Sequence, residues 1–283
     1  MSSKLHDTKS DFIGRKILSF FLFLSLVLLS IACVAKGAII NGNMIENKFT
    51  SYAAVSALRQ DIITFTKDGF LKNGLNDENI NDIISQAKVE AVAKSFAASE
   101  FKSKTGYTKE SSKQDVAALC NDIKAEIVKQ VKASGFEYNE KAVNSQVQKI
   151  DKFINAQLVM PGSKYIETAF NVGKIGVNIF VAVSVFLTLV FGSMLFFTGK
   201  REYRSIRSIG VSFCSAGIAD LFASIIALII FSIKSIDIYP MFIKNAIDSY
   251  ISTSIGAVAA CGACFILITL VLLAISWKLK RER

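Results

Sequence analysis

Four long apolar runs constrain this chain more than any other feature of its sequence. They cover residues 17–35, 175–198, 209–233 and 251–277, and Asp220 is the only charged residue in any of them. A helix needs about 20 residues to cross the roughly 30 Å hydrocarbon core of a bilayer. Strands of a membrane barrel alternate in polarity over about ten residues, and these runs do not. The sequence therefore predicts an all-α, polytopic membrane protein with four transmembrane helices.

The first run also has features of a signal peptide. Basic residues precede it, and "CVAKG" at its end is similar to a cleavage site. Its apolar stretch is longer than the usual core of 7 to 15 residues. "SIAC", ending at Cys33, is similar to a lipoprotein box, but Ser30 stands where an aliphatic residue is required. We expect an uncleaved anchor, with cleavage as the alternative.

Lysine and arginine residues at the ends of the runs predict the orientation. They gather in three segments: Lys4, Lys9, Arg15 and Lys16; Lys200, Arg201, Arg204 and Arg207; and Lys278, Lys280, Arg281 and Arg283. Such residues are enriched in short cytoplasmic loops, and four crossings place all three segments on one side. We therefore expect a multi-pass plasma-membrane protein whose N- and C-termini are cytoplasmic.

The expected layout divides the chain into nine parts. They are a cytoplasmic tail at 1–16, transmembrane helix 1 at 17–40, an extracellular helical domain at 41–170, transmembrane helix 2 at 171–198, a cytoplasmic loop at 199–208, transmembrane helix 3 at 209–233, an extracellular loop at 234–250, transmembrane helix 4 at 251–277 and a cytoplasmic tail at 278–283.

The net charge of +10 follows this layout. Residues 41–170 hold 17 basic and 16 acidic residues, so the excess lies in the three cytoplasmic segments. This distribution favours anionic lipid headgroups as partners and excludes nucleic acid, which needs a basic folded face. The segment also lacks an Asn-x-Ser/Thr acceptor and has Cys120 as its one cysteine. The absence of a glycosylation acceptor and of a disulfide pair favours a bacterial source, because eukaryotic surface domains often have one or both.

Residues 41–170 carry four amphipathic stripes at helical spacing, which predict a four-helix bundle. Asn76 is the expected N-cap of the second helix, and Gly69 and Gly135 are expected C-terminal caps. The expected buried faces are Phe49, Ala53, Ser56, Ile63 and Phe70; Ile80, Ile84, Ala87, Ala91 and Phe96; Val116, Leu119, Ile123, Ile127 and Val131; and Val143, Val147, Ile150, Ile154 and Leu158.

No catalytic constellation is present in the sequence. His6 is the only histidine, and it lies in the predicted cytoplasmic tail. "CGAC" at 261–264 has the spacing of a metal or redox pair, but no second pair accompanies it, so small residues on an apolar helix explain it better. We expect a non-enzymatic protein without a cofactor or metal.

Asp220 is the candidate intramembrane polar site. A carboxylate at the bilayer centre costs about 2.5–3.5 kcal/mol on insertion scales, so we expect a partner, from Asn178, Ser184, Ser254 or Thr269. Two interpretations stay open: a polar clasp between helices, and a proton or ion site. Small residues at spacing four also predict close helix packing: Ser212, Ala216 and Asp220, then Gly256, Ala260 and Cys264.

The cytoplasmic loop carries a second candidate site for coupling or lipid contact, formed by Lys200, Arg201, Glu202, Arg204 and Arg207. Arg201 and Glu202, followed by Gly210 before the third span, resemble the loop of FtsX/MacB-type permeases of ABC systems, as does the order of spans and domains. The resemblance implies an ATPase subunit docked on 200–209, whose ATP hydrolysis would move the extracellular domain. Those families usually have strands in that domain, whereas this one is predicted to be helical.

The sequence thus favours a four-span plasma-membrane protein that displays a helical domain for binding, sensing or scaffolding. Its expected partners are membrane lipids, an extracellular protein or ligand, and a further copy of the chain. The alternative is a permease or mechanotransmission subunit of an ABC-type system. A small transporter is least favoured, since no broken-helix Gly/Pro pair points to a midplane site.

Overall fold

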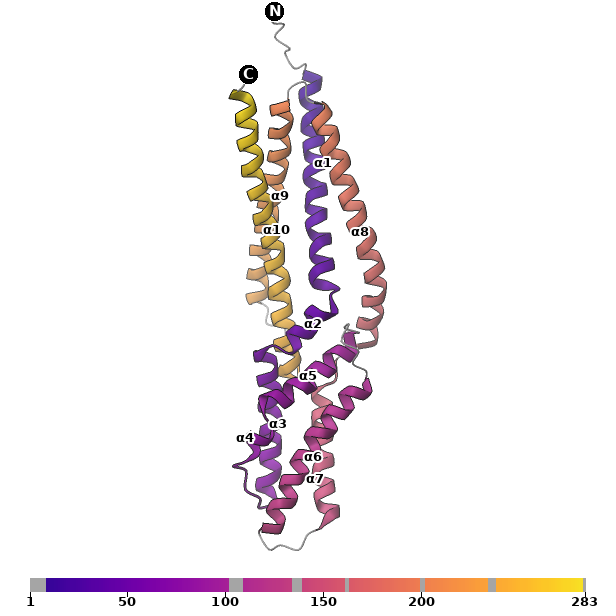
Figure 1. Ribbon diagram of the computed structural model, residues 1–283, viewed down its shortest axis with the longest axis vertical. Coiled ribbons are helices and arrows are strands. Elements are labelled where there is room, and N and C mark those ends of the chain that lie inside the picture. The colour runs from indigo at the N-terminus through magenta and orange to yellow at the C-terminus, as the bar shows by residue number, and fades with distance from the viewer. Residues whose placement is uncertain are drawn as a thin grey trace, which may run out of the picture. The chain divides into compact units, whose positions relative to one another are not determined.

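A computed structural model describes residues 9–101, 109–133, 139–160, 163–198, 202–233 and 238–281 of the chain. These residues form helices and no strand, as the sequence predicts (Figure 1). The elements are α1 (Lys9–Val34), η1 (Ala35–Ile39), α2 (Gly42–Phe49), α3 (Tyr52–Lys72), α4 (Ile80–Ile83), α5 (Gln86–Phe101), α6 (Lys109–Ala133), α7 (Glu140–Gln157), α8 (Ser163–Thr198), α9 (Glu202–Ile233) and α10 (Met241–Arg281).

The chain divides into two compact units. The apolar unit comprises Met1–Ile40, Asn171–Ser235 and Ser252–Arg283, and the globular unit comprises Asn41–Phe170 and Ile236–Ile251. The described residues include four helices that are long and apolar enough to cross a membrane, which confirms that part of the prediction, although the fourth begins within the globular unit. They cover Phe12–Ala38, Val172–Thr198, Glu202–Ile233 and Met241–Arg281.

Helix α1 holds the apolar unit together by packing on two neighbours. On one side Phe21 stacks on Phe191 of α8, with ring centroids 5.3 Å apart. On the other side the hydroxyls of Ser19 and Ser212 of α9 lie 2.6 Å apart. Helix α10 then packs on α9, where the Phe213 and Phe265 rings meet edge to face. The helices therefore follow the order α8, α1, α9 and α10 across the unit.

The outward faces of these helices are covered with large apolar side chains. Phe197 is 82% exposed and Ile233 is 76% exposed. Others with more than half of their surface exposed include Phe20, Ile175, Ile179, Phe186, Leu189, Phe222, Ile229, Leu267, Leu270 and Trp277. Water-soluble monomers rarely expose contiguous apolar patches of this extent.

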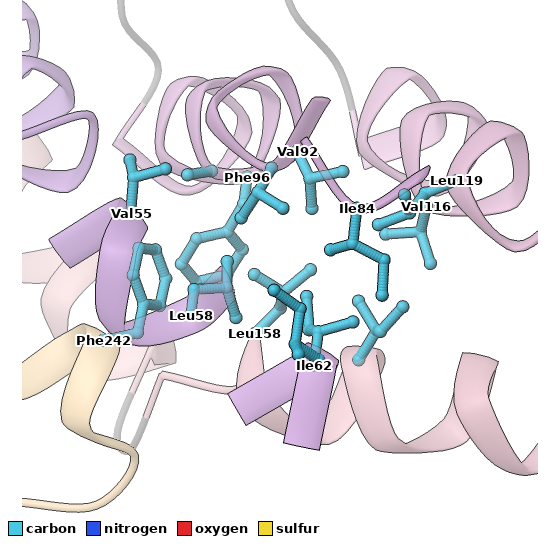
Figure 2. Close-up of a cluster of buried hydrophobic side chains, with 14 of the residues drawn as sticks. Val55, Leu58, Ile62, Ile84, Val92, Phe96, Val116, Leu119, Leu158 and Phe242 are labelled. Carbon is cyan, nitrogen blue, oxygen red and sulfur yellow. The ribbon is translucent and has the colours of Figure 1, made fainter. Parts of the chain in front are cut away.

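The globular unit has its own hydrophobic core, in which α3 and α6 each pack on both α5 and α7. Figure 2 shows side chains of this core, including Leu58 of α3, Val92 of α5, Leu119 of α6 and Leu158 directly after α7. The predicted faces of α6 and α7 are confirmed, because their members are buried apart from the half-buried Val131 and Val147. Asn139 caps α7 by accepting a hydrogen bond from the Ala142 amide.

The predictions for the first half of this unit are wrong in part. A break at Ile84–Ser85 separates α4 from α5 and resets the helical phase, so Ala87 and Ala91 are exposed while Val89 and Val92 are buried. Arg59 stabilises the break by donating to the carbonyls of Ile84 at 2.6 Å and Asn81 at 2.8 Å.

Other expected positions shift for similar local reasons. Ala53 is exposed and Ser56 half-buried, because α3 buries Ala54, Val55 and Leu58 instead.

The expected helix caps also differ. Asn76 begins a turn, in which it accepts from the Glu78 amide, and not a helix. Gly69 lies inside α3 against Gln146 of α7, whereas Gly74 takes the positive φ of +67° beyond that helix. Gly135 lies outside the described residues.

The segment after the third apolar run completes the globular core. The sequence predicts a separate extracellular loop at 234–250, yet Phe242, Ile243 and Ala246 are fully buried in the core of the globular unit. The Phe242 ring lies 5.4 Å from Phe49 and 6.2 Å from Phe96, and Figure 2 shows it beside Val55. The globular unit is therefore built from two stretches that are distant in the chain.

Candidate functional site

Asp220 lies buried in the middle of α9, with 3% of its surface exposed. Ser30 of α1 donates a hydrogen bond of 3.0 Å to its Oδ1. Its Oδ2 is buried and has no hydrogen-bond partner among the described residues. The arrangement thus contains one satisfied and one open acceptor position, so this acid can clasp α1 to α9 and can also hold a proton.

The partner of Asp220 is not among those that the sequence suggested. Ser184 donates to the carbonyl of Phe180 within its own helix, and Thr269 donates to the carbonyl of Gly210 at 3.1 Å. The sequence pattern does not by itself identify Ser30 as the partner of Asp220. It does contain a feature that points to this contact. Ser19 and Ser30 are separated by about three helical turns, so both lie on one face of the first apolar run.

Helices α9 and α10 approach each other closely beside Asp220, whose Cβ lies 3.1 Å from a Cβ added to Gly262. A Cβ added to Gly217 would lie 2.6 Å from the Gly262 carbonyl oxygen, and one added to Gly262 would lie 2.8 Å from that of Gly217. Only glycine permits such backbone approach. The crossing therefore depends on this glycine pair.

The two predicted stripes of small residues differ in outcome. Ser212, Ala216 and Asp220 are buried on α9, as expected. Their counterparts on α10, at 256, 260 and 264, are exposed because the helix turns Gly262 toward α9 instead.

A groove of about 840 Å³ lies at the end of the apolar unit where α1 and α9 begin and α10 ends. Five cations from these three helices line it: Arg15, Lys16, Arg204, Arg207 and Lys280. None of the described residues that line the groove carries a carboxylate. The described lining of the groove is therefore basic and is suited to an anion.

Hydrogen bonds between helices hold the walls of this groove together. Ser276 of α10 donates to the carbonyl of Tyr203 in α9 at 2.9 Å. Ser19 of α1 donates to the carbonyl of Ser208 at 3.3 Å, and Ser212 donates to the carbonyl of Ser19 at 2.8 Å. The three helices are thus fixed relative to one another at the level of the cations.

The predicted loop site is divided by the structure. Arg204 and Arg207 line the groove, while Glu202 is exposed in the first turn of α9 and is not part of the lining. Lys200 and Arg201 lie outside the described residues. The sequence did not assign Arg15, Lys16 and Lys280 to the same site, because only the packing of α1 and α10 against α9 brings them to Arg207.

No group of three or more His, Cys, Asp or Glu side chains among the described residues is placed to hold a metal ion. The candidate sites among the described residues of the apolar unit are therefore the Ser30–Asp220 contact and the basic groove. Comparisons with protein families, curated proteins and solved structures find no match to this chain.

Proposed function

We propose that this chain is a multi-pass, non-enzymatic plasma-membrane protein. Its apolar unit would anchor its globular unit outside the membrane, where that unit binds, senses or scaffolds a partner. The observation that carries the proposal is the contrast between the two units. One exposes large apolar side chains along four membrane-length helices, and the other buries its apolar residues in a closed core.

The charge distribution supports the proposed orientation. The groove end of the apolar unit carries the cations of α1, α9 and α10, and such residues are retained on the cytoplasmic side. Because Arg204 precedes the third apolar run and Ile236–Ile251 follows it, one crossing separates the groove from that part of the globular unit. The globular unit, with 17 basic and 16 acidic residues in 41–170, gives no opposing bias.

Four large apolar side chains among the described residues of the globular unit are at least 60% exposed. The exposed fractions are 80% for Tyr52, 81% for Tyr239, 61% for Leu71 and 60% for Val159. Exposed tyrosines contribute much of the binding energy at protein interfaces. They are the first positions at which to look for a bound partner.

The binding role is tested by photo-crosslinking in native membranes with the full chain. A photoreactive amino acid at Tyr52 or Tyr239 is expected to form a discrete adduct from the outer face, whereas the same group at the fully buried Leu58 should form none. If none of the four exposed positions gives an adduct under conditions in which the chain is needed by the cell, a partner-binding role is contradicted.

A second candidate function is the permease subunit implied by the resemblance of the loop. It is favoured by the exposure of Glu202 and Arg207 in the first two turns of α9, where a cytoplasmic ATPase could contact them. Co-purification of a nucleotide-binding subunit with the wild-type chain, and its loss in the Glu202→Lys variant, would support this candidate over the first.

A further inference from the structure

We propose that the basic groove of the apolar unit binds the headgroup of an anionic phospholipid. The inference rests on the proposed membrane insertion, but it adds a defined ligand and site. The ligand chemistry is a phosphodiester attached to an acyl chain, and its source is the leaflet that surrounds the groove end of the four helices.

The charge of the groove selects an anion. Five cations surround one cavity of about 840 Å³, and no carboxylate is among the described residues that line it. Basic side chains gathered in this way attract a phosphate and donate charge-assisted hydrogen bonds to it. Arg15 is only 8% exposed, so part of this charge lies within the packed helices and not on a solvated face.

The walls of the groove select a lipid over a free phosphate. Phe12, Tyr203 and Trp277 line it beside the cations, and Phe12 and Trp277 are 52% and 67% exposed. Aromatic rings of this kind settle at the level of lipid headgroups. Val211 and Leu273 extend the lining toward the apolar length of the helices, where an acyl chain would continue.

The level of the groove along the helices agrees with a headgroup site. Arg15 and Lys16 directly precede the first apolar run, Arg207 lies two residues before the third, and Lys280 follows the fourth within three residues. Basic pockets between membrane helices at the cytoplasmic side bind anionic headgroups. The hydrogen bonds from Ser19 and Ser276 preorganise the three walls, so little ordering accompanies binding.

The test uses the full chain in neutral detergent micelles and compares phosphatidylglycerol with phosphatidylcholine of the same acyl chains. Native mass spectrometry counts bound lipid, and titration gives its Kd. The variant Arg207→Gln/Lys280→Gln removes two exposed cations of the groove. The matched control, Lys278→Gln/Arg281→Gln, removes two exposed charges at the same end of α10 that are not in the lining.

We expect the wild type to bind phosphatidylglycerol at least about tenfold more tightly than phosphatidylcholine, because both lipids carry a phosphodiester but the basic side chains of the groove repel the choline cation of phosphatidylcholine. The groove variant should lose that preference by about tenfold or more, and the control should keep it within about twofold. Equal loss in both variants would show general surface attraction and overturn the site. Displacement by millimolar inorganic phosphate or glycerol phosphate would overturn the assignment to a lipid.

The outcome is separable from the proposed membrane insertion. Binding is measured in micelles, whereas insertion is measured by resistance of the chain to alkaline carbonate extraction from membranes. A chain that resists extraction but shows no lipid preference contradicts the headgroup site alone. A chain that is extracted contradicts insertion, and with it the assignment of the groove to a membrane lipid, whatever the micelle result.

Discussion

Replacement of Phe242 by alanine is expected to open the globular unit, although this residue lies 72 positions beyond residue 170. Its side chain is 0% exposed and contacts the rings of Phe49 and Phe96. Truncation of a buried phenylalanine to alanine costs about 3–5 kcal/mol through lost transfer free energy and the cavity that remains. We expect the free energy of opening to fall by this amount.

Cys120 provides the assay, because it lies in the same core with 4% of its surface exposed. Burial raises the pKa of its thiol to about 12, with a smaller contribution from the nearby Asp151 carboxylate. At pH 7.5 the native thiol is therefore almost wholly protonated, and a maleimide reacts with it only after the core opens. The labelling rate of a chain that retains Cys120 alone reports the opening equilibrium.

A loss of about 3–5 kcal/mol corresponds to labelling that is about one hundred to a few thousand times faster, since about 1.4 kcal/mol is a factor of ten. Phe242→Leu keeps most of the apolar volume and should lose less than about 1.5 kcal/mol. Tyr239→Ala, at a neighbouring residue that is 81% exposed, is the matched control and should label at the wild-type rate. Wild-type labelling in Phe242→Ala would refute the two-stretch core.

Three further predictions concern single positions. Gly262→Ala should lower the melting temperature in detergent by the equivalent of about 1–3 kcal/mol, because its Cβ would overpack against Gly217. Gly256→Ala is the control and should not lower it, because a Cβ there meets nothing within 4 Å. Equal melting temperatures for the two variants would contradict the glycine crossing. Asp220→Asn should keep the bond from Ser30 and the stability, and Asp220→Leu should lose about 0.6 to 1.7 kcal/mol; loss of cellular function in a stable Asn variant would replace the clasp with a titrating role. The Gln130 amide, with help from Asn79 and Lys129, lowers the pKa of Glu126 below its usual 4.5, so this contribution to stability is present above that pH and is lost as the pH falls through the folded value. In circular-dichroism melts between about pH 3 and 6, Glu126→Gln should reduce the fall of the melting temperature with falling pH. Glu110→Gln on the same helix is the control, and an unchanged pH dependence in Glu126→Gln would contradict this prediction.

The sequence predicts the class of fold well because long apolar runs and single amphipathic stripes are local patterns. The faces of α6 and α7 follow directly from the spacing of residues such as Ile123, Ile150 and Ile154. The errors arise where a helix changes phase. The break at Ser85 depends on the Arg59 side chain from α3, which satisfies carbonyls that the helix would otherwise use itself, and no periodicity within 76–96 reveals that contact.

The sites were less accessible to sequence reasoning because they join distant segments. Asp220 stands out as a lone charge in an apolar run, but its partner is Ser30, 190 residues away. Arg207 stands out as part of a basic loop, but its groove requires Arg15 and Lys280 from helices at the two ends of the chain. The Gly217–Gly262 crossing is likewise a property of two helices together, since "CGAC" shows only small residues.

Sidedness of the chain in an intact cell tests the central claim most directly. In a chain whose own five cysteines are replaced, Tyr239→Cys should react with a membrane-impermeant maleimide from outside, because the side chain is 81% exposed in the globular unit. Arg207→Cys, exposed in the groove, should react only after the membrane is permeabilised. Reaction of Arg207→Cys in intact cells, with Tyr239→Cys protected, would contradict the orientation on which the proposed function rests.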